Sequence, residues 1–339
     1  WSAASPRSEP SAMRVLITGA RGFIGRSQVT HLSQRGWQVV AMDLAPPRDQ
    51  SPPGVTVATA DIRVPEQWRP ALAGVDAVIH LASAHLQVDL PESVYWETNV
   101  KSLRPLLEAS RDAGVRHFVH TSSVGVHGSL ATVPGDEDAP LAPESVYEQT
   151  KAAGEDAVRG FLPDAGAMGV TIVRPAWVYG PGDPRTERIL SAVSRGRFIM
   201  FGGGRNQRHP IYIDDYVSGV ERILLKPETY GHTYILAGPA YLTSRELIAA
   251  AEQVTGGKAR IRVPLALGYA AGLGAELAGR IAGVAPPISR RTLAFFTNRN
   301  AFLTARARRD FGFAPSVGIV EGFQRVWATM QQGRYSPGH

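Results

Sequence analysis

The first half of the chain alternates short apolar runs with helical patterns, and this alternation limits the possible folds more than any other feature. The apolar runs have the length of strands and lie at residues 14–18, 37–43, 55–61, 77–83, 117–123 and 170–176. Helical spacing separates them, at residues 22–36, 65–73, 91–113 and 144–160. Strands that are apolar on both faces and alternate with helices form a parallel sheet with helices on both sides. We therefore predict an α/β fold, a doubly wound parallel sheet of the Rossmann type.

The pattern changes after about residue 180, where glycine and proline become frequent and helical patterns dominate, as at residues 243–256 and 263–284. We predict a dinucleotide-binding domain at 13–180 and a smaller, mostly helical substrate-binding region at 181–335, from which one strand returns to the main sheet. Residues 1–12 precede Met13, where the first strand begins, and we interpret them as a tag or disordered tail.

A glycine-rich turn, TGARGFIG at residues 18–25, lies between the first strand and the first helix. Gly19 permits a tight turn, Gly22 lets the backbone approach a pyrophosphate, and Gly25 allows the helix to pack closely on the strand. The free N–H groups at the start of the helix would then face the phosphates. The turn predicts a dinucleotide site.

Asp43 ends the second strand, 18 residues after Gly25. An acidic side chain at this distance holds the ribose hydroxyls of a dinucleotide, and its charge repels a 2′-phosphate, so NAD is favoured over NADP. Asp43 could instead be a turn residue that ends the strand. Arg21 and Arg48 keep NADP possible, because either could pair with a phosphate.

Tyr147 and Lys151, in YEQTK, lie one helical turn apart on a predicted helix. In isolation such a pair can be structural, because the tyrosine ring can lie along the lysine stem. An ammonium beside a phenol also lowers the pKa of the phenol, which otherwise titrates near 10. The pair is therefore a candidate for acid–base chemistry.

Several motifs, in this order, resemble the extended short-chain dehydrogenases/reductases, also called the NAD-dependent epimerase/dehydratase family. They are TGARGFIG, DIR (61–63), HLAS (80–83), Asn99, TSSVGVHG (121–128), YEQTK, RPAWVYGPG (174–182) and IYIDDYVSG (211–219). The resemblance extends from Met13 to about residue 330, and the tail at 302–315 is similar to the 3β-hydroxysteroid dehydrogenase-like branch. It implies hydride transfer between a nicotinamide cofactor and a secondary alcohol or ketone.

The resemblance also implies roles for individual residues. Tyr147 would exchange the hydroxyl proton, Lys151 would lower the pKa of Tyr147 and bond to the nicotinamide ribose, and Ser123 would position the reacting oxygen. We choose Ser123 over Ser122 because of its distance from the VHG element. The implied cofactor contacts are Gly19, Arg21, Gly22, Phe23, Ile24, Gly25, Asp43, Asp61, Ile62, Leu81, Ala82, Ser83, Asn99, Tyr147, Lys151 and Pro175.

The sequence indicates the substrate less directly than the cofactor. Family dehydratases carry an Asp-Glu pair where this chain has Ser122 and Ser123, so we do not expect dehydration. Trp177 stands where nucleotide-sugar epimerases often have Asn, which favours an apolar substrate, whereas Arg208 matches an arginine that those epimerases place on the substrate phosphate. The other predicted substrate contacts are His85, Ser123 and Val124.

We favour a dehydrogenase or ketoreductase that acts on an apolar or aromatic hydroxy or keto compound. A nucleotide-sugar 4-epimerase with tightly bound NAD is the alternative, and a non-catalytic cofactor-binding regulator is a more distant one. The resemblance further implies a homodimer, in which the helices at 91–113 and 144–160 pair with those of a second copy.

Composition excludes several other classes. The chain has no cysteine, which excludes disulfides and thiolate metal sites, and we predict no metal. Its net charge of +6 comes from scattered arginines, so we expect no nucleic acid partner. No apolar run is long enough to span a membrane, and we expect a cytoplasmic protein. The acidic segment 136–140 is interpreted as a solvated loop.

Overall fold

The computed structural model describes residues 13–46, 51–85, 90–282 and 290–333, without the side chains of 276–282 and 290–292. The predicted tail at 1–12 and Arg48 lie outside this part of the chain.

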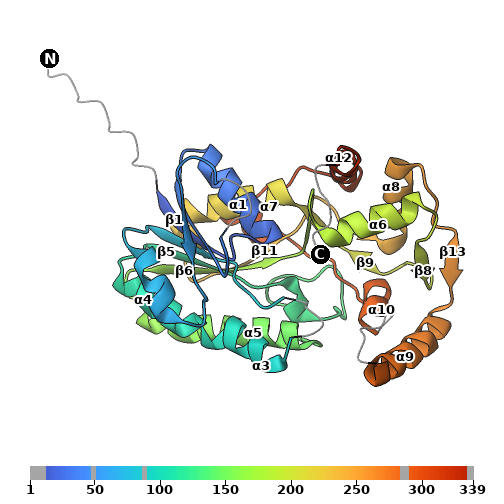
Figure 1. The fold of residues 1–339 in the computed structure, drawn as a ribbon, viewed down its shortest axis with the longest axis horizontal. Coiled ribbons are helices and arrows are strands. Elements are labelled where there is room, and N and C mark those ends of the chain that lie inside the picture. The colour runs from blue at the N-terminus through green and yellow to red at the C-terminus, as the bar shows by residue number, and fades with distance from the viewer. Residues whose placement is uncertain (1–12, 47–50, 86–89, 283–289, 334–339) are drawn as a thin grey trace, which may run out of the picture.

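Seven parallel strands form the central sheet, in the order β11-β6-β5-β4-β1-β2-β3 (Figure 1). Their bounds are β1 Arg14–Thr18, β2 Gln38–Asp43, β3 Val55–Thr59, β4 Ala77–His80, β5 His117–Thr121, β6 Gly169–Pro175 and β11 Thr233–Leu236. The predicted Rossmann-type α/β fold is therefore confirmed. Strand order reverses between β1 and β4, and ligands of such sheets bind at the carboxyl ends of the strands beside this point.

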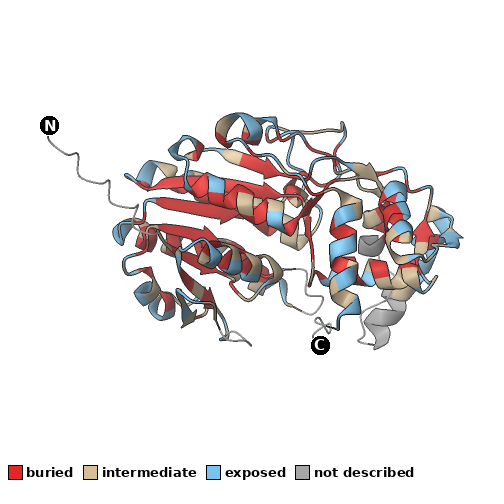
Figure 2. Ribbon diagram, turned by 90° about the horizontal axis from the view of Figure 1, so that it is seen from above, coloured by how far each residue is buried: buried red, intermediate tan, exposed pale blue. Residues whose placement is uncertain are grey.

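Helices cover both faces of the sheet, α1 (Phe23–Gln34) and α7 (Ile213–Leu224) on one face and α4 (Leu103–Asp112) and α5 (Val146–Phe161) on the other (Figure 1). Successive residues of a strand point to opposite faces. Val15 and Ile17 accordingly join one hydrophobic core and Leu16 joins the other. Figure 2 shows most strands of the sheet buried along most of their length, as expected for strands between two helical layers, whereas the edge strand β3 has no buried residue.

The predicted helix at 91–113 is interrupted. The structure has α3 (Glu92–Trp96), a π-helical turn (Glu97–Lys101) and then α4. In the π turn the Ser102 N–H donates to the Glu97 carbonyl at 3.1 Å. Such turns occur often at functional sites, and this one contains Asn99. The apolar spacing of the sequence runs through the turn and does not reveal it.

The rest of the chain is mostly helical, as predicted for the C-terminal region. It also contains three small strand pairs that were not predicted, β7–β10, β8–β13 and β9–β12. The bounds of its helices are α6 Pro184–Ser194, α8 Ser244–Thr255, α9 Leu265–Ala282, α10 Arg290–Thr297, α11 Ala305–Phe311 and α12 Ile319–Gln331. The strands are β7 Trp177–Tyr179, β8 Ile199–Phe201, β9 Gln207–Arg208, β10 Pro210–Tyr212, β12 Leu242–Thr243 and β13 Ile261–Val263. The division at residue 180 stays a prediction.

Short helices complete the description: α2 Pro65–Trp68 and the 3-10 turns Arg69–Leu72, Val124–His127, Leu162–Asp164 and Pro227–Thr229. Within the part of the chain described, no helix combines the length and apolar character needed to cross a membrane.

Candidate active site

The glycine turn is closely packed on one side and open on the other. Gly19 has a positive φ of 69°, and a Cβ there would lie 2.8 Å from the backbone nitrogen of Ala82. A Cβ on Gly25 would collide with the Gly19 carbonyl oxygen. At Gly22 a Cβ would meet only that carbonyl within 4 Å, at 3.3 Å. Gly19 and Gly25 are thus required by packing, and Gly22 leaves the outer side of the turn accessible.

The start of α1 offers uncapped N–H groups beside this turn. Gly22 is the N-cap residue and supplies no side-chain acceptor to Phe23, Ile24 or Gly25, the first residues of the helix. Unsatisfied N–H groups at a helix N-terminus favour an anion. The predicted turn residues therefore lie where a pyrophosphate would bind.

Asp43 lies against the glycine turn. Its Oδ2 accepts the Arg21 N–H at 2.8 Å, and its Oδ1 accepts the Leu44 N–H at 2.8 Å. The carboxylate at the end of β2 is thus held beside the turn, as a ribose-binding acid would be. The same hydrogen bonds also stabilise the turn itself.

The segment after β4 is held against the turn by Thr18. The Thr18 hydroxyl accepts the N–H groups of Leu81 at 3.1 Å and Ala82 at 3.0 Å, and it shares a hydrogen bond with His80 Nδ1 at 2.8 Å. Leu81 and Ala82 therefore line the turn at the reversal point of the sheet.

Asp61 and Ile62 follow β3, at the far edge of the sheet. Arg63 forms an ion pair of 2.6 Å with Asp61, and this hydrogen bond lowers the pKa of the Asp61 carboxyl. The Ile62 carbonyl accepts from Trp68 Nε1 at 3.0 Å. Both residues are thus held in place near Asp43, at the carboxyl ends of the strands.

Asn99 connects the cofactor residues with the catalytic helix. Its Oδ1 accepts from the Ser83 hydroxyl at 3.0 Å and from the Ala84 N–H at 2.8 Å. Its Nδ2 donates to Thr150 Oγ1 at 2.9 Å, and Thr150 donates to the Tyr147 carbonyl at 2.9 Å. A polar chain therefore runs from the segment after β4 to α5.

Tyr147 and Lys151 lie together at the carboxyl ends of the strands. A capping box of Ser145 and Glu148 starts α5, which places Tyr147 in its first turn. Lys151 Nζ donates to the Thr121 carbonyl at 2.8 Å and lies 5.9 Å from the centre of the Tyr147 ring. The ammonium is therefore close enough to stabilise a phenolate.

Burial opposes charge on both groups. It raises the pKa of Tyr147 to about 12, although the nearby Arg185 charge and a hydrogen bond from Ser123 lower that pKa. Burial also lowers the pKa of Lys151 to about 8. Without a ligand the phenol is thus protonated at neutral pH, and a further positive charge beside it would be needed to bring its pKa into the working range.

Ser123 and His85 lie against Tyr147, and Val124 follows Ser123 in the next turn. Ser123 caps the turn at Val124–His127 by accepting the Gly125 N–H at 3.0 Å, and it is the serine that bonds to Tyr147. The His85 ring lies edge-on to the Tyr147 ring, with centroids 4.8 Å apart. Val124 is buried at the start of this turn.

Pro175 ends β6 and pairs in register with Leu236 of β11. It therefore lies at the carboxyl ends of the strands, like the other site residues. The next predicted residue, Trp177, opens β7 and is half-buried. The structure therefore places Pro175 and Trp177 on the segment that leads from the sheet into the C-terminal region.

Trp177 and three residues from other segments form a contact cluster. The Phe295 ring lies edge-on to that of Trp177 at 6.1 Å, the Arg185 guanidinium lies 5.9 Å from the Trp177 ring centre, and the Arg208 guanidinium lies 4.3 Å from the Phe295 ring centre. Burial lowers the pKa of Arg208 to about 10, and the Arg185 charge adds to this effect. We call Trp177, Arg185, Arg208 and Phe295 the substrate-side cluster.

An arginine in a folded protein often forms an ion pair with a carboxylate at the surface. Arg208 forms no such pair within the described residues, and its buried Nε has no hydrogen-bond partner there. The Asn300 amide, in the orientation that satisfies both of its ends, accepts from the Arg208 guanidinium at 3.3 Å. Arg208 thus keeps unused donor capacity.

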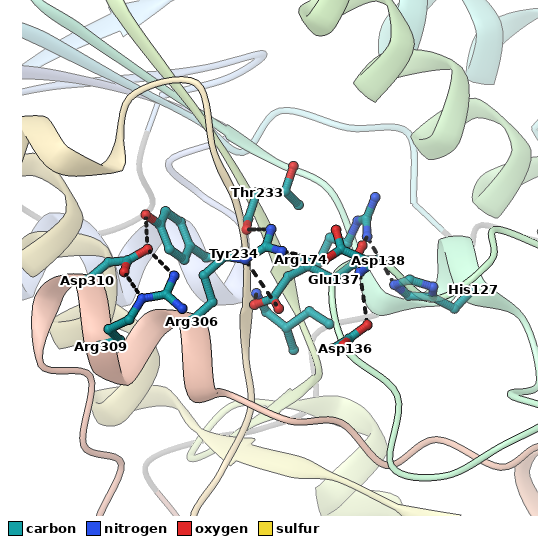
Figure 3. Close-up of polar contacts among 11 residues, drawn as sticks. His127, Asp136, Glu137, Asp138, Arg174, Thr233, Tyr234, Arg306, Arg309 and Asp310 are labelled. Carbon is teal, nitrogen blue, oxygen red and sulfur yellow. Dashed lines mark hydrogen bonds and ion pairs between the residues drawn. The ribbon is translucent and has the colours of Figure 1, made fainter.

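A polar network around Arg174 joins the catalytic helix to the sheet, and Figure 3 shows the part of it near His127 and Glu137. Arg174 of β6 forms two hydrogen bonds with Glu155 of α5, at 2.8 and 2.6 Å, and also donates to the Glu137 carbonyl at 2.8 Å. His127 Nε2 lies 3.1 Å from the same guanidinium. Arg174 and Glu155 are 2% and 0% exposed, so this pair fixes the catalytic helix to the sheet without access to water.

The interpretation of 136–140 as a solvated loop is wrong for Glu137, which is buried. Its Oε1 accepts the Ile235 N–H of β11 at 3.0 Å, and Arg306 of α11 lies 3.8 Å from its Oε2. The neighbouring Asp138, exposed as predicted, pairs with Arg306 at 2.6 Å (Figure 3). A partner distant in sequence therefore holds the loop down, and local composition cannot show it.

Sequence reasoning did not single out Arg185 or Phe295. Arg185 lies three residues after the RPAWVYGPG motif, at the start of α6, and a cation so close to a site motif is a usable signal. Phe295 lies 118 residues after Trp177, in α10, and no spacing in the sequence connects the two. Within the described residues no group of acidic and histidine side chains has the arrangement of a metal site.

The model of the NAD dependent epimerase/dehydratase family matches residues 15–237, more than half of the chain. A dTDP-glucose 4,6-dehydratase of Streptomyces griseus is 31% identical over 94% of this chain and 94% of its own length. A 3-beta-hydroxysteroid dehydrogenase of Mycolicibacterium neoaurum is 28% identical over 89% of this chain and 87% of its own.

Among solved structures, that of the dTDP-glucose 4,6-dehydratase DesIV from Streptomyces venezuelae, with NAD and TYD bound, is similar to this chain. The TM-score is 0.77 and the identity 26%, over 96% of this chain and 99% of the other. The similarity therefore covers the C-terminal region as well as the sheet.

Proposed function

The chain belongs to the NAD dependent epimerase/dehydratase family, and on that basis we propose that it transfers hydride between NAD and a secondary alcohol or ketone. It is an enzyme of this family and uses NAD. The observation that carries the proposal is the meeting of Tyr147, Lys151 and Ser123 at the carboxyl ends of the strands, beside the glycine turn. We favour a dehydrogenase or ketoreductase.

The residues present fit NAD. The uncapped start of α1 suits a pyrophosphate, the open side of Gly22 leaves room for it, and Asp43 is placed to bond ribose hydroxyls. Lys151 would bond the nicotinamide ribose, and Asn99 would hold the segment after β4 in place. When bound, NAD accepts or returns the hydride.

In the oxidation direction Tyr147 would take the hydroxyl proton of the substrate, and in reduction it would return the proton to the developing alkoxide. Ser123 would bond to the same oxygen and hold it beside the phenol. Lys151 would favour the phenolate, because its ammonium lies near the Tyr147 ring. The raised pKa of Tyr147 without ligand makes this assistance necessary.

The nucleotide-sugar 4-epimerase is the second candidate, and Arg208 favours it. Arg208 is half-buried, has no carboxylate partner within the described residues and could take a substrate phosphate. The aromatic contacts of Trp177 with Phe295 favour the apolar substrate instead. Ser122 and Ser123, in place of an acidic pair, argue against dehydration, although two similar proteins are dehydratases.

The test uses purified protein, NAD and a panel of secondary alcohols that includes hydroxysteroids and hydroxyalkanoates. A dehydrogenase produces the absorbance of reduced nicotinamide, and the corresponding ketone with NADH removes it. Mass spectrometry of the cofactor released on denaturation identifies NAD or NADP. Retained NAD, interconversion of nucleotide sugars and no net reduction of NAD would identify an epimerase. Inactivity in every assay would support the non-catalytic cofactor-binding regulator.

We also propose a homodimer formed through the face that carries α3, α4 and α5. These helices lie together on one side of the sheet (Figure 1), and Trp96 of α3 is 38% exposed. A second copy seated on these helices would cover the exposed part of the Trp96 ring. Light scattering at micromolar concentration measures the mass, and a monomer would refute the proposal. The cytoplasmic location stays a prediction.

A further inference from the structure

The turns that follow α6 and α8 lie against each other in the C-terminal region. A Cβ on Gly257 would collide with the Val193 carbonyl oxygen, and one on Gly196 would lie 3.8 Å from the Lys258 carbonyl oxygen. The strands β8 and β13, which follow these turns, then pair in parallel. Side chains that are about 60 residues apart in sequence therefore share one surface at this place.

This surface carries positive charge without an acidic counterpart. The segments 194–204 and 256–275 contain no acidic residue. Five exposed cations lie on them, which we call the basic edge: Arg195, Arg197, Lys258, Arg260 and Arg262. Lys258 has one ion pair, with Glu252 at 3.7 Å, and none of the four arginines pairs with a carboxylate of the described residues. The basic edge therefore keeps most of its charge available for a partner.

The helix α9 begins beside the basic edge and exposes apolar side chains. Residues 263–275 include no charged side chain. The helix packs on the protein along a narrow seam, where a Cβ on Gly268 would lie 2.7 Å from Phe201 Cδ1. Away from the seam Leu267 is 60% exposed and Leu273 is 64% exposed. Neighbouring large apolar side chains so exposed on one helix indicate a contact surface.

The partner must match both features. Figure 1 shows β8, β13 and α9 together at one end of the molecule, so the basic edge and α9 belong to one surface. A second copy of the chain would bring five further cations to the contact and no acidic residue from these segments. A membrane with anionic headgroups offers negative charge at its surface and apolar chains below it, which a helix lying in the interface can reach.

We propose that the basic edge and the exposed face of α9 dock on the surface of an anionic lipid membrane. The cations would lie at the headgroups, and Leu267 and Leu273 would enter the boundary of the acyl chains. Such docking needs no spanning segment, and no described helix could span a bilayer. This inference goes beyond the proposed function and does not depend on the reaction.

Docking would also bring the lipid close to the substrate side of the site. A Cβ on Gly268 of α9 would lie 3.0 Å from Leu293 Cδ2 of α10, so the two helices are packed together. Phe295, on the same helix α10, contacts Trp177. The membrane-facing helix is thus one helix away from the substrate-side cluster.

The test measures flotation of the purified full chain with vesicles of phosphatidylcholine alone and of equimolar phosphatidylcholine and phosphatidylglycerol. The anionic vesicles should bind at least about tenfold more tightly, since each Lys or Arg near an anionic surface contributes roughly a fivefold gain. Binding should weaken as the salt concentration rises, because salt screens exposed charges.

Two pairs of substitutions test the two features. Arg260→Gln with Arg262→Gln should weaken binding to anionic vesicles at least about tenfold. The control pair, Arg69→Gln with Arg308→Gln, removes the same charge from exposed arginines on other elements and should change little.

Leu267→Ser with Leu273→Ser should also weaken binding about tenfold or more, because apolar contact with the membrane is lost. Leu225→Ser with Leu303→Ser is the control pair, since both are exposed leucines of other elements. The substituted side chains are all exposed, so the variants should fold, which urea unfolding checks.

The proposal requires that both test pairs weaken binding and both control pairs leave it unchanged. Equal binding to neutral and anionic vesicles, or binding that either test pair leaves unchanged, overturns it. Self-association that the leucine pair abolishes, without vesicle binding, would assign the face to a second copy and overturns it as well. Wild-type binding that does not respond to salt does the same, and this measurement needs no variant.

Discussion

On the cofactor side of the site the protein presents mostly backbone, in the glycine turn, the start of α1 and the segment after β4. On the substrate side it presents side chains, Trp177, Arg185, Arg208 and Phe295, which come from β7, α6, β9 and α10. The first arrangement needs glycines at set places, and its geometry follows from one strand–turn–helix unit. The second arrangement depends on packing between segments up to 118 residues apart. A fold can therefore keep its cofactor and change its substrate by replacing a few side chains.

Tyr147 lies where the two sides meet, and its replacement should have the largest effect. Tyr147→Phe removes the group that exchanges the proton, so we expect kcat to fall by about 10²-fold or more. NAD affinity, measured by titration, should stay nearly unchanged. Tyr241→Phe, at a tyrosine that is 46% exposed, is the control. If Tyr147→Phe retains more than about a tenth of the wild-type kcat, the assignment of the acid–base residue is wrong.

The Arg174–Glu155 pair anchors the catalytic helix α5 to strand β6, and breaking it should reduce stability strongly. Glu155→Gln leaves the guanidinium buried without its counter-charge, which typically costs about 3–5 kcal/mol. Urea unfolding measures the free energy of unfolding. Glu108→Gln makes the same chemical change at an exposed ion pair with Arg104 and should cost less than about 1 kcal/mol. Equal losses in the two variants would contradict the role given to the buried pair.

The two sides also differ in how well the sequence predicts them. The strands, the glycine turn, Asp43 and the Tyr147–Lys151 spacing all follow from local patterns, because each sits within one or two adjacent elements. The burial of Glu137 and the approach of Phe295 to Trp177 depend on contacts between distant segments. The π turn at Asn99 is local, but the apolar spacing does not reveal it. Arg208 was identified from its position just before the IYIDDYVSG motif, but its lack of a carboxylate partner among the described residues could only be seen in three dimensions.

The burial of Lys151 should appear in the pH dependence of stability. Its folded pKa is about 8, below the value near 10.4 of an unfolded lysine. Between these values the unfolded chain binds more protons, so the free energy of unfolding rises with pH. From pH 7.5 to 9.5 the Lys151 contribution should rise by about 1–2 kcal/mol. Urea unfolding without nucleotide measures it, and Lys151→Met should lack the rise that wild type shows. An identical pH profile in the two proteins would mean that Lys151 is not desolvated.

Asp43 is the exception on the cofactor side, because there a side-chain charge makes the selection. Its carboxylate beside the glycine turn should repel the 2′-phosphate of NADP, so Asp43→Asn should reduce the preference for NAD by about tenfold, or 1.4 kcal/mol. The amide can still accept one of the two backbone hydrogen bonds, so the turn should persist and NAD should bind with similar affinity. Titration with NAD and NADP measures both constants, with Asp112→Asn as an exposed control. If the ratio of the affinities for NAD and NADP does not change, a cation such as Arg21 must determine which of the two cofactors is preferred. If the affinity for NAD falls by the same factor as the NAD-to-NADP affinity ratio, Asp43 acts mainly by stabilising the glycine turn. The cofactor side would then be formed by backbone groups alone.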